Sequence, residues 1–409
     1  MLPSYVPMPL RYRILDSLGS QAEKLGIPIT RIDAQTLHDA AEHETGLSDF
    51  GDPYYRDGLD VLLNSIKKDA NLHFFGRFGT RMVLLTYLSQ RLLFVEAQKQ
   101  MPEVFHSEIM APFIIIGLPR SGTTILHRML SVDPENAGIP MWRLYRPFSP
   151  IGKKDTRQAM TRWELQFRRP VFPEMDSKHV IREDREEECI WMMGLTFHSI
   201  SFWVVAPVSS YAEWLFAQDQ KKYYEEYSLL LKAQQQATPG RRLVLKAPDH
   251  TPNLGALLSA VPNARVIYLH RDPATCLTSA NSMFYSAHRA VTNDINPQRL
   301  AEINRKMYTH YLVGGQKARS DPSVNDVILD VQYENLVKDP MQTVKNIYAH
   351  FGVPWSDEYE ERLQSFLSNH PKDKHGAHHY TPEQFGQSAD ELNKHFASVS
   401  DDVSISTKK

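Results

Sequence analysis

Residues 113–130, FIIIGLPRSGTTILHRML, join an apolar run, a turn rich in glycine and hydroxyl residues, and a helical pattern. Phe113 to Ile116 are too few for a helix, and their β-branched composition favours a buried strand. The turn from Gly117 to Thr124 follows at once, and apolar residues then recur on one helical face. Backbone N–H groups and the helix dipole both face such a loop, so this arrangement suits a bound phosphate.

The spacing of Gly117 and Gly122 is that of a nucleotide-binding phosphate loop, but the next residues are Thr123 and Thr124 instead of a Lys-Ser/Thr pair. A nucleoside triphosphatase needs that lysine on the outer phosphates and the hydroxyl on magnesium. This loop carries its positive charge inside, at Arg120. The pattern favours a phosphate bound without a metal, and the alternative is a glycine turn that binds no ligand.

Three further apolar segments, at 243–245, 264–269 and 327–331, predict short strands separated by helical patterns. Strands that alternate with helices indicate an α/β fold with a parallel sheet, in which ligands bind at the carboxyl ends of the strands. Lys246 and Arg271 directly follow the second and third predicted strands. Together with the loop around Arg120, they predict one anion site at three successive strand ends.

The rest of the chain predicts a helical region at 1–104 and a domain at 105–396. Apolar residues at helical spacing, such as Leu59, Leu62 and Ile66, support the first assignment. An insertion at about 135–240, rich in aromatic residues and methionine, is where an α/β fold builds a substrate pocket. The small polar residues at 397–409 predict a disordered tail.

Composition excludes several classes of protein. The 409 residues have a net charge of -2, so nucleic acid is an unexpected partner. Two distant cysteines, Cys189 and Cys276, support neither a disulfide framework nor a metal knuckle. No stretch has the length of a membrane span, so we expect a cytoplasmic protein without integral membrane association. The oligomeric state is left open.

Three segments, GLPRSGTT, LKAPDH and ARVIYLHRDPATCLTS, resemble the signature segments of sulfotransferases that use 3′-phosphoadenosine 5′-phosphosulfate (PAPS). The chain is most similar to the bacterial-type branch with a helical N-terminal region, from about residue 46 to about residue 386. The resemblance implies a P-loop-like three-layer sandwich with a central parallel sheet. It also implies PAPS as co-substrate and no metal.

The resemblance assigns roles to individual residues. Lys246 matches a basic residue near the bridging oxygen, and Arg271 with Ser279, eight residues later, matches the 3′-phosphate pair. The residues that match the 5′-phosphosulfate loop are Arg120, Ser121, Gly122, Thr123 and Thr124. The residues that resemble a loop closing over the nucleotide are Lys374, His375 and Gly376.

One position departs from the family. Several sulfotransferases have a catalytic glutamate shortly after the loop helix, often just after a tryptophan, but here Trp142 is followed by Arg143. Another group must then accept the proton of the acceptor. A histidine titrates near neutrality without help, whereas a glutamate needs its pKa raised by burial. The candidates are His179, Glu187, Glu188 and His250.

The sequence thus predicts a PAPS-dependent sulfotransferase that acts on a hydroxyl or amine of a small-molecule or lipid-like acceptor. Two alternatives stay open. A P-loop kinase or other phosphotransferase would need the lysine that the loop lacks. A nucleotide-binding protein without catalytic activity is supported by Arg143, because that position lacks the expected glutamate.

Overall fold

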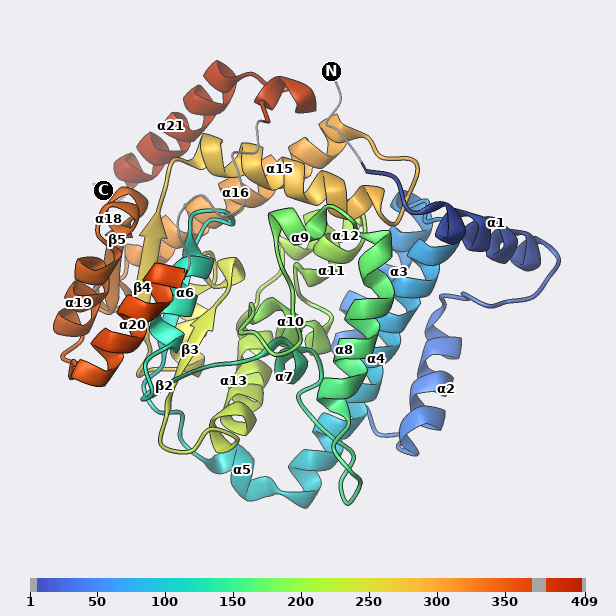
Figure 1. Cartoon of the computed structure of the whole chain (residues 1–409), viewed down its shortest axis with the longest axis horizontal. Helices are drawn as coiled ribbons and strands as arrows, with labels where there is room; N and C mark the ends of the chain where they lie inside the picture. Colours follow the sequence, from blue (N-terminus) through green and yellow to red (C-terminus); the bar gives the residue numbers. More distant parts are fainter. Residues whose placement is uncertain (1–5, 370–379, 407–409) are drawn as a thin grey trace.

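The computed structural model describes residues 6–369 and 380–406, without the side chains of 176 and 400–406. Its centre is a five-stranded, wholly parallel sheet in the order β2-β3-β1-β4-β5 (Figure 1). The strands are β1 (Phe113–Gly117), β2 (Asn136–Gly138), β3 (Arg242–Lys246), β4 (Arg265–His270) and β5 (Ile328–Gln332). The predicted α/β fold is confirmed. Only the short β2 lacks a strand pattern in the sequence.

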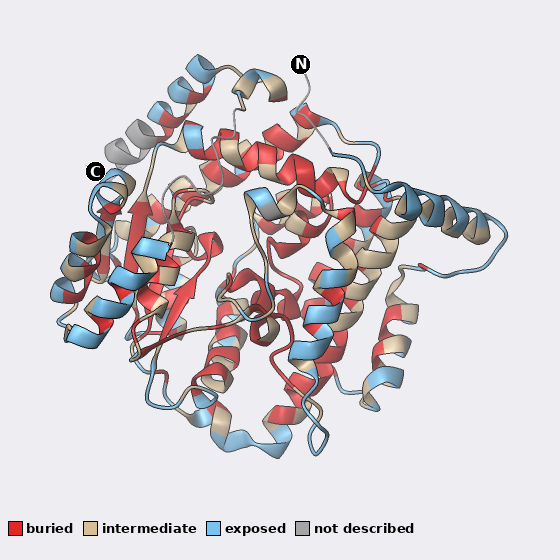
Figure 2. Ribbon diagram, in the orientation of Figure 1, coloured by how far each residue is buried: buried red, intermediate tan, exposed pale blue. Residues whose placement is uncertain are grey.

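Helices cover both faces of the sheet, because alternate strand residues point to opposite sides. Ile114 and Ile116 belong to a large core cluster shared with the N-terminal helices and the insertion. Phe113 and Ile115 belong to a second cluster, shared with helices that follow β1 and β5. Strands β1, β3 and β4 are among the most deeply buried segments, whereas the edge strand β5 is partly exposed (Figure 2). This is the three-layer arrangement that the resemblance implied.

The helices before β1 are α1 (Leu10–Lys24), α2 (Ala34–Thr45), α3 (Tyr55–Asp69), α4 (Phe74–Gln100) and α5 (Pro102–His106). The helices between β1 and β3 are α6 (Thr123–Ser131), α7 (Met141–Tyr145), α8 (Arg157–Arg168), η1 (Arg169–Val171), α9 (Met175–Lys178), α10 (Ile190–Met193), η2 (Gly194–Thr196), α11 (Ser201–Val205), α12 (Ser209–Leu215) and α13 (Lys221–Gln236). The later ones are η3 (Pro248–His250), α14 (Leu254–Ala260), α15 (Pro273–Arg289), α16 (Pro297–Arg319), α17 (Pro322–Asn325), α18 (Tyr333–Lys338), α19 (Pro340–His350), α20 (Asp357–Asn369), η4 (Pro382–Phe385) and α21 (Ala389–Ser406).

The long helix α4 ties the N-terminal helices to the rest of the molecule. Its Arg91 is buried, donates to the carbonyl oxygen of Phe50, and pairs with Glu226 of α13 at 2.9 Å. Apolar residues of α4 share the large core cluster with the sheet. The boundary predicted at residue 104 therefore does not separate two cores. No helix within 6–369 or 380–406 is both long and apolar enough to cross a membrane.

Helix α21 continues through Ser406, past position 397. The disordered tail expected at 397–409 stays a prediction. Leu392, Phe396 and Val399 of this helix are buried. Three apolar residues at helical spacing hold the helix, although most residues around them are small or polar.

Candidate active site

The loop between β1 and α6 has the backbone that a bound anion requires. Gly122 has φ +100°, and a Cβ there would lie 2.8 Å from the ring of Tyr333. Only glycine adopts this conformation without strain, and it also allows the close approach of the ring. Arg120 has φ +69°, a strained conformation for a residue with a side chain. Such strain is concentrated at ligand sites.

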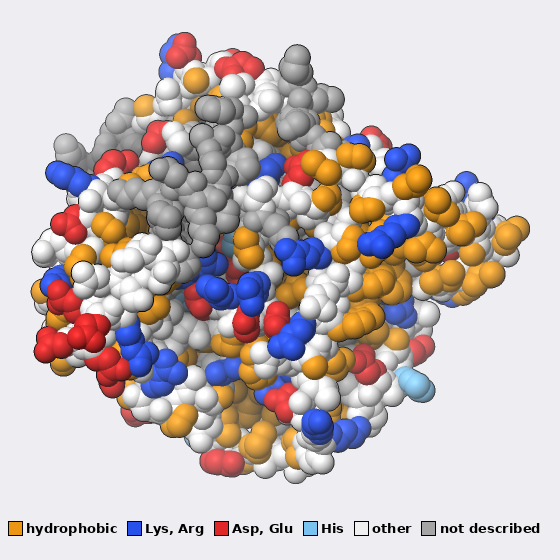
Figure 3. Space-filling view, in the orientation of Figure 1, with side chains coloured by type: hydrophobic (Ala, Val, Ile, Leu, Met, Phe, Trp, Pro, Cys, Tyr) orange, Lys and Arg blue, Asp and Glu red, His pale blue; other side chains and the backbone are white. Residues whose placement is uncertain are grey.

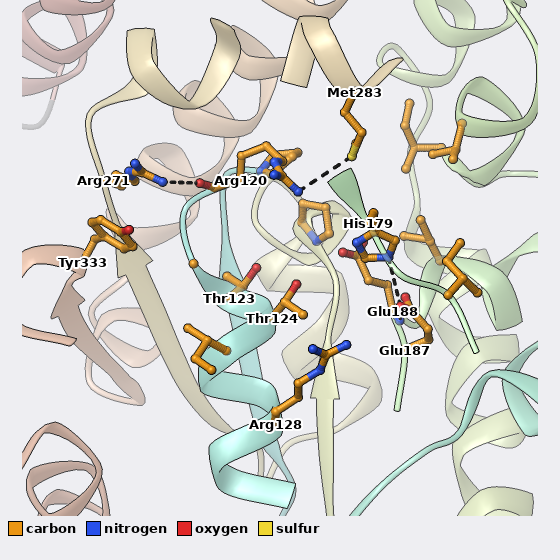
Figure 4. Close-up of a pocket in the computed structure, with 18 of the residues that line it drawn as sticks. Arg120, Thr123, Thr124, Arg128, His179, Glu187, Glu188, Arg271, Met283 and Tyr333 are labelled. Atoms are coloured by element: carbon orange, nitrogen blue, oxygen red, sulfur yellow. Dashed lines mark hydrogen bonds and ion pairs between the residues drawn. The ribbon is translucent and has the colours of Figure 1, made fainter. Parts of the chain in front are cut away.

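Two arginines from neighbouring strand ends meet at this loop. Arg271, after β4, donates from Nη1 to the carbonyl oxygen of Arg120 at 2.9 Å, and its guanidinium lies 4.0 Å from the ring centre of Tyr333 (Figure 4). Arg120 donates from Nε to Ser279 Oγ at 3.2 Å. Within the described ranges, neither arginine forms an ion pair with a carboxylate. Both charges are therefore available to an anion.

The hydroxyl residues of the loop divide between the cavity and the protein interior. Thr123 and Thr124 line the cavity at the start of α6, and Arg128 lies one turn later on the same side of the helix (Figure 4). Ser121 is fully buried, and its Oγ donates to the carbonyl oxygen of Leu118 at 2.7 Å. The side chain of Ser121 thus stabilises the loop from inside, and we assign it no direct contact with an anion.

Lys246 ends β3 beneath the loop. Its Nζ lies 2.6 Å from Glu188 Oε1 and 3.4 Å from Thr124 Oγ1, and its side chain is almost completely buried. Cys189 follows Glu188, and its backbone N–H donates to the carbonyl oxygen of Lys246. This hydrogen bond fixes the backbone next to Glu188 against the end of β3. A buried ammonium paired with one carboxylate still has donors for a second acceptor. Lys246 is thus positioned to bind an anion that also contacts Thr124.

His179 and Glu187 form a second polar pair on the opposite wall. His179 Nε2 lies 2.9 Å from Glu187 Oε1, and Glu187 Oε2 accepts the N–H of Glu188 at 3.1 Å. Burial alone would raise the pKa of Glu187, but the charge and hydrogen bond of His179, with nearby Lys246, outweigh it and lower that pKa to about 2. Glu187 is therefore ionised at neutral pH. It orients the ring of His179 through their contact at 2.9 Å.

Two adjoining cavities meet at His179. The first, of about 630 Å³, contains the loop, Arg271 and Tyr333. The second, of about 640 Å³, lies against α8 and the segment after α9. The residues common to both linings are Met175, His179, Ile181, Trp191, Val204 and Ala287. An anion-binding end and a chamber lined by both apolar and charged residues thus share one wall that carries a candidate base.

A model of the sulfotransferase family matches residues 112–357, which include the loop, Lys246, Arg271 and both glutamates. The chain belongs to the sulfotransferase family. It is accordingly an enzyme that transfers a sulfuryl group, and the kinase alternative is not favoured. The loop without its lysine is the sequence feature that pointed away from a kinase.

Known sulfotransferases resemble it over most of its length. The omega-hydroxy-beta-dihydromenaquinone-9 sulfotransferase Stf3 of Mycobacterium bovis is 25% identical over 284 residues, which cover 67% of this chain and 71% of that protein. The crystal structure of STF1 from Mycobacterium tuberculosis is 28% identical with a TM-score of 0.73, covering 90% of this chain and 99% of that one. STF9 from Mycobacterium avium is 25% identical with a TM-score of 0.78, covering 90% and 96%.

His250 lies outside the sulfotransferase site, contrary to its selection as a candidate base. It is fully buried behind β3, its Nδ1 lies 2.8 Å from the hydroxyl of Tyr224, and its Nε2 lies 3.4 Å from that of Tyr227. Burial lowers its pKa to about 3. Because His250 is close to Lys246 in sequence, it was expected at the cavity. The chain turns inward at η3, so His250 packs into the core instead.

Arg143 also points away from the cavities of this sulfotransferase. Its Nε and Nη2 donate to the side-chain and backbone oxygens of Gln234 on α13, each at 2.8 Å, and burial lowers its pKa to about 10. The side chain at 143 therefore lines neither of the two cavities.

The structure describes the predicted 3′-phosphate pair, and the predicted closing loop lies outside the described residues. Arg271 lines the cavity, and Ser279 on α15 lies 2.8 Å from the hydroxyl of Tyr380 as well as near Arg120. Lys374, His375 and Gly376 lie outside the described residues.

Two contributors to the sulfotransferase cavity were missed in the sequence. Tyr333 directly follows β5, so the strand-end rule that selected Arg271 could have found it. Arg128 lies four residues after Thr124, on the same face of α6, and pairs with Glu186 at 3.4 Å. The helical spacing was the available signal for Arg128.

Proposed function

We propose that this sulfotransferase uses PAPS as donor and transfers its sulfuryl group to a hydroxyl or amine of an extended, largely apolar acceptor. The observation that carries the proposal is the position of His179 at the junction of the cavity that contains the phosphate loop and a second cavity with a mixed apolar and charged lining. The relative named for a menaquinone derivative supports a lipid-like acceptor.

The residues at the donor end fit a nucleotide with two separate anionic groups. The loop N–H groups, Thr123 and Thr124 are suited to the 5′-phosphosulfate. Arg271 and Ser279 are suited to the 3′-phosphate. Arg120 belongs to the loop and connects it to this pair, since its side chain contacts Ser279 and its backbone contacts Arg271. PAPS, when bound, supplies the sulfuryl group and a phosphate leaving group.

His179 is the proposed general base. Its Nε2 is bonded to Glu187, so Nδ1 is the nitrogen that takes the proton of the acceptor. The ionised Glu187 stabilises the imidazolium that forms, in the manner of a carboxylate behind a catalytic histidine. A positioned base of this kind contributes about 10²–10⁴-fold to a rate.

Lys246 is proposed to stabilise the leaving group. Negative charge develops on the 5′-phosphate as the bond to sulfur breaks, and Lys246 Nζ lies 3.4 Å from Thr124 Oγ1 at the loop. Glu188 Oε1 holds the Lys246 ammonium at 2.6 Å. Glu188 is thus a positioning residue, and Lys246 is the group that contacts the reacting atoms.

The second cavity is proposed to hold the body of the acceptor. Its apolar lining comes from α7, α8, the segment between α8 and α10, α10, α11 and α15, and arginines and acidic residues lie among the apolar ones. The apolar lining residues are Met141, Leu165, Phe172, Met175, Val180, Ile181, Trp191, Val204, Val205 and Ala287. A chamber of this composition suits an aliphatic or aromatic chain whose reactive end reaches His179.

Calorimetric titration with 3′,5′-adenosine bisphosphate and with ATP and magnesium tests the donor. We expect the bisphosphate to bind preferentially and Arg271→Ala to weaken its binding by about tenfold or more, because a charge-assisted contact is lost. Arg265→Ala, at the opposite end of β4, is the matched control and should bind normally. Preference for ATP with magnesium, or equal binding by Arg271→Ala, would contradict the proposal.

Transfer is tested separately, with labelled PAPS and a series of alcohols of increasing chain length. Turnover that improves with chain length supports an apolar acceptor. Bisphosphate binding without turnover on any acceptor would favour the alternative of an inactive nucleotide-binding protein.

A further inference from the structure

Helix α1 contacts the protein through its polar side. Asp16 Oδ1 accepts the N–H of Phe75 at 2.7 Å and lies 3.0 Å from His73 Nδ1, at the start of α4. About two turns later, Glu23 pairs with Arg77. Gly19, between the two acids on the same side, lies against the ring of Phe74, where a Cβ would come within 2.6 Å. Polar bonds, the glycine contact and an aromatic contact of Tyr12 with Phe75 therefore attach the helix.

The apolar side of α1 faces outward. Leu10, Ile14, Leu15 and Leu18 are between 52% and 66% exposed. All residues of α1 belong to the described part of the chain, and none is buried. A helix that packs on a core normally turns this stripe inward. The inverted orientation leaves a continuous apolar surface in water, which marks an interaction site.

The same outer surface carries only positive charge. Asp16 and Glu23 are the only acidic residues from 6 to 31, and both are paired inward. Arg11, Arg13 and Lys24 are exposed around the apolar stripe. We propose that α1 docks this sulfotransferase on the surface of an anionic lipid bilayer, with its apolar stripe in the interface and its basic side chains at the headgroups.

Charge favours a bilayer over a second copy of the chain. Two copies paired through α1 would bring Arg11, Arg13 and Lys24 of each into proximity, without carboxylates to neutralise them. An anionic bilayer neutralises these charges and accepts the apolar side chains at the same time. An anionic bilayer is thus one partner that matches both the apolar stripe and the positive charge of this surface.

The apolar surface continues from α1 toward the second cavity. Tyr12 contacts Phe75 of α4 at 5.6 Å between ring centres, and Phe75 contacts Phe167 of α8 at 6.5 Å. Phe167 stacks on Trp163, which is 57% exposed. Figure 3 shows hydrophobic side chains gathered over α1 and continuing across the neighbouring helices, with Lys and Arg among them. Leu165, two residues after Trp163, lines the second cavity.

The docking surface and the second cavity are connected by this apolar surface, so docking would place the cavity close to the bilayer. An enzyme that rests on a bilayer through α1 and Trp163 holds the α8 side of the second cavity at the level where apolar molecules reside. Tryptophan is enriched at that depth because its ring is apolar and its N–H is polar. The docking proposal stands without the proposed donor and acceptor, since it depends only on the exterior of the protein.

Flotation of the whole chain with vesicles tests the proposal. The probes are vesicles of pure phosphatidylcholine and vesicles that contain about 30% phosphatidylglycerol. We expect the wild type to float with the anionic vesicles and the double variant Ile14→Ser/Leu18→Ser to lose at least about tenfold in partitioning. Because both side chains are exposed, this variant should keep the circular dichroism spectrum and melting temperature of the wild type.

Two further variants separate the contributions. Ile151→Ser/Val313→Ser removes two exposed apolar side chains far from α1 in sequence and should float like the wild type. Arg13→Glu/Lys24→Glu should remove the preference for anionic vesicles, since it reverses the charge of the surface. Retention of that preference by the charge variant would overturn the proposal.

Three other results would also overturn it. They are absence of wild-type flotation with anionic vesicles, equal flotation of Ile14→Ser/Leu18→Ser and wild type, and a wild-type dimer in sedimentation that this variant dissociates. The last result would assign the surface to a second copy of the chain. None of these measurements uses nucleotide or acceptor, so failure here is distinguishable from failure of the proposed function.

Discussion

His179 and Glu187 come from the two ends of one irregular segment and meet at 2.9 Å, so their effects on catalysis should be linked. We expect His179→Ala to lower kcat by about 10²–10⁴-fold and to leave bisphosphate affinity unchanged, because the base contacts the acceptor side. Glu187→Gln keeps the hydrogen bond and removes the charge. We expect it to lower kcat as well, since the imidazolium that forms during transfer loses its counter-charge.

Steady-state kinetics on the two variants and their double mutant provide the measurement. His270→Ala is the control, because His270 lies beside Arg271 but is bonded to Asp330. Strictly additive losses in the double mutant would count against a linked pair, since residues that act as a unit are non-additive. Full activity of His179→Ala would exclude it as the base.

Individual site residues differed in how far the sequence could predict them. Lys246 and Arg271 were found because each directly follows a strand, and parallel strands bring their carboxyl ends to one edge. His250 satisfied the same local rule but packs into the core, since the turn at η3 is decided by tertiary packing. The contact of His179 with Glu187 depends on an irregular segment, so sequence named both residues without predicting the pair.

At the level of elements, the phosphate loop depends on the absence of a side chain at Gly122. Gly122→Ala should abolish detectable bisphosphate binding and cost about 1–3 kcal/mol in the free energy of unfolding, because its φ of +100° is strained and its Cβ would meet Tyr333. Gly255→Ala in α14 is the matched control, since a Cβ there meets nothing within 4 Å. It should bind normally and gain about 0.5–1 kcal/mol from helix propensity. Titration and urea unfolding measure both effects, and normal binding by Gly122→Ala would refute the assigned loop.

Helix α8 supplies one wall of the second cavity, so a larger side chain on it should discriminate between acceptors. Leu165→Trp fills part of that cavity without approaching the loop. We expect kcat/KM to fall by about tenfold or more for long-chain alcohols, with little change for the shortest ones and for bisphosphate binding. Kinetics across the chain-length series measure the change, and an equal loss for every acceptor would contradict the assignment of this cavity.

The sequence can predict that α1 is a helix, but it cannot predict the orientation of that helix in the protein. Apolar spacing can identify an amphipathic helix, but it does not say whether the stripe faces the core or the solvent. Here Asp16 and Glu23 find partners on α4, and these polar bonds turn the stripe outward. The partners come from another part of the chain, so only the folded structure reveals the orientation.

The whole molecule should lose stability in mild acid. Burial lowers the pKa of His127 and His250 to about 3 and that of His198 and His288 to about 4. The unfolded chain therefore binds more protons than the native one below about pH 6.5, and the free energy of unfolding falls as pH falls. Asp249, whose pKa burial raises to about 6, acts in the opposite sense and offsets part of this effect.

We expect a net uptake of about two to three protons on unfolding near pH 5. Proton uptake during urea unfolding in weakly buffered solution, with melting temperatures from about pH 7.5 to about pH 5.5, provides the measurement. A melting temperature that is constant over this range would contradict the expectation. His250→Phe should reduce the uptake by about one proton.

The α/β class and the order of strands and helices were predictable because both follow from local hydrophobic period and short turns. The sharing of one core by α4 and the sheet was not, since it depends on contacts between residues far apart in sequence. Arg91 illustrates the difference. Its sequence neighbours predict a helix, but its burial against Glu226 requires the folded structure.

That pair also constrains the order in which the newly made chain can fold. Arg91 leaves the ribosome 135 residues before Glu226. At about 5–20 residues per second, its carboxylate partner follows roughly 7–27 seconds later. During that interval α4 cannot reach its final position without burying an unpaired guanidinium, which is costly. The final packing of α4 against the insertion is therefore complete only after residue 226 has been synthesised.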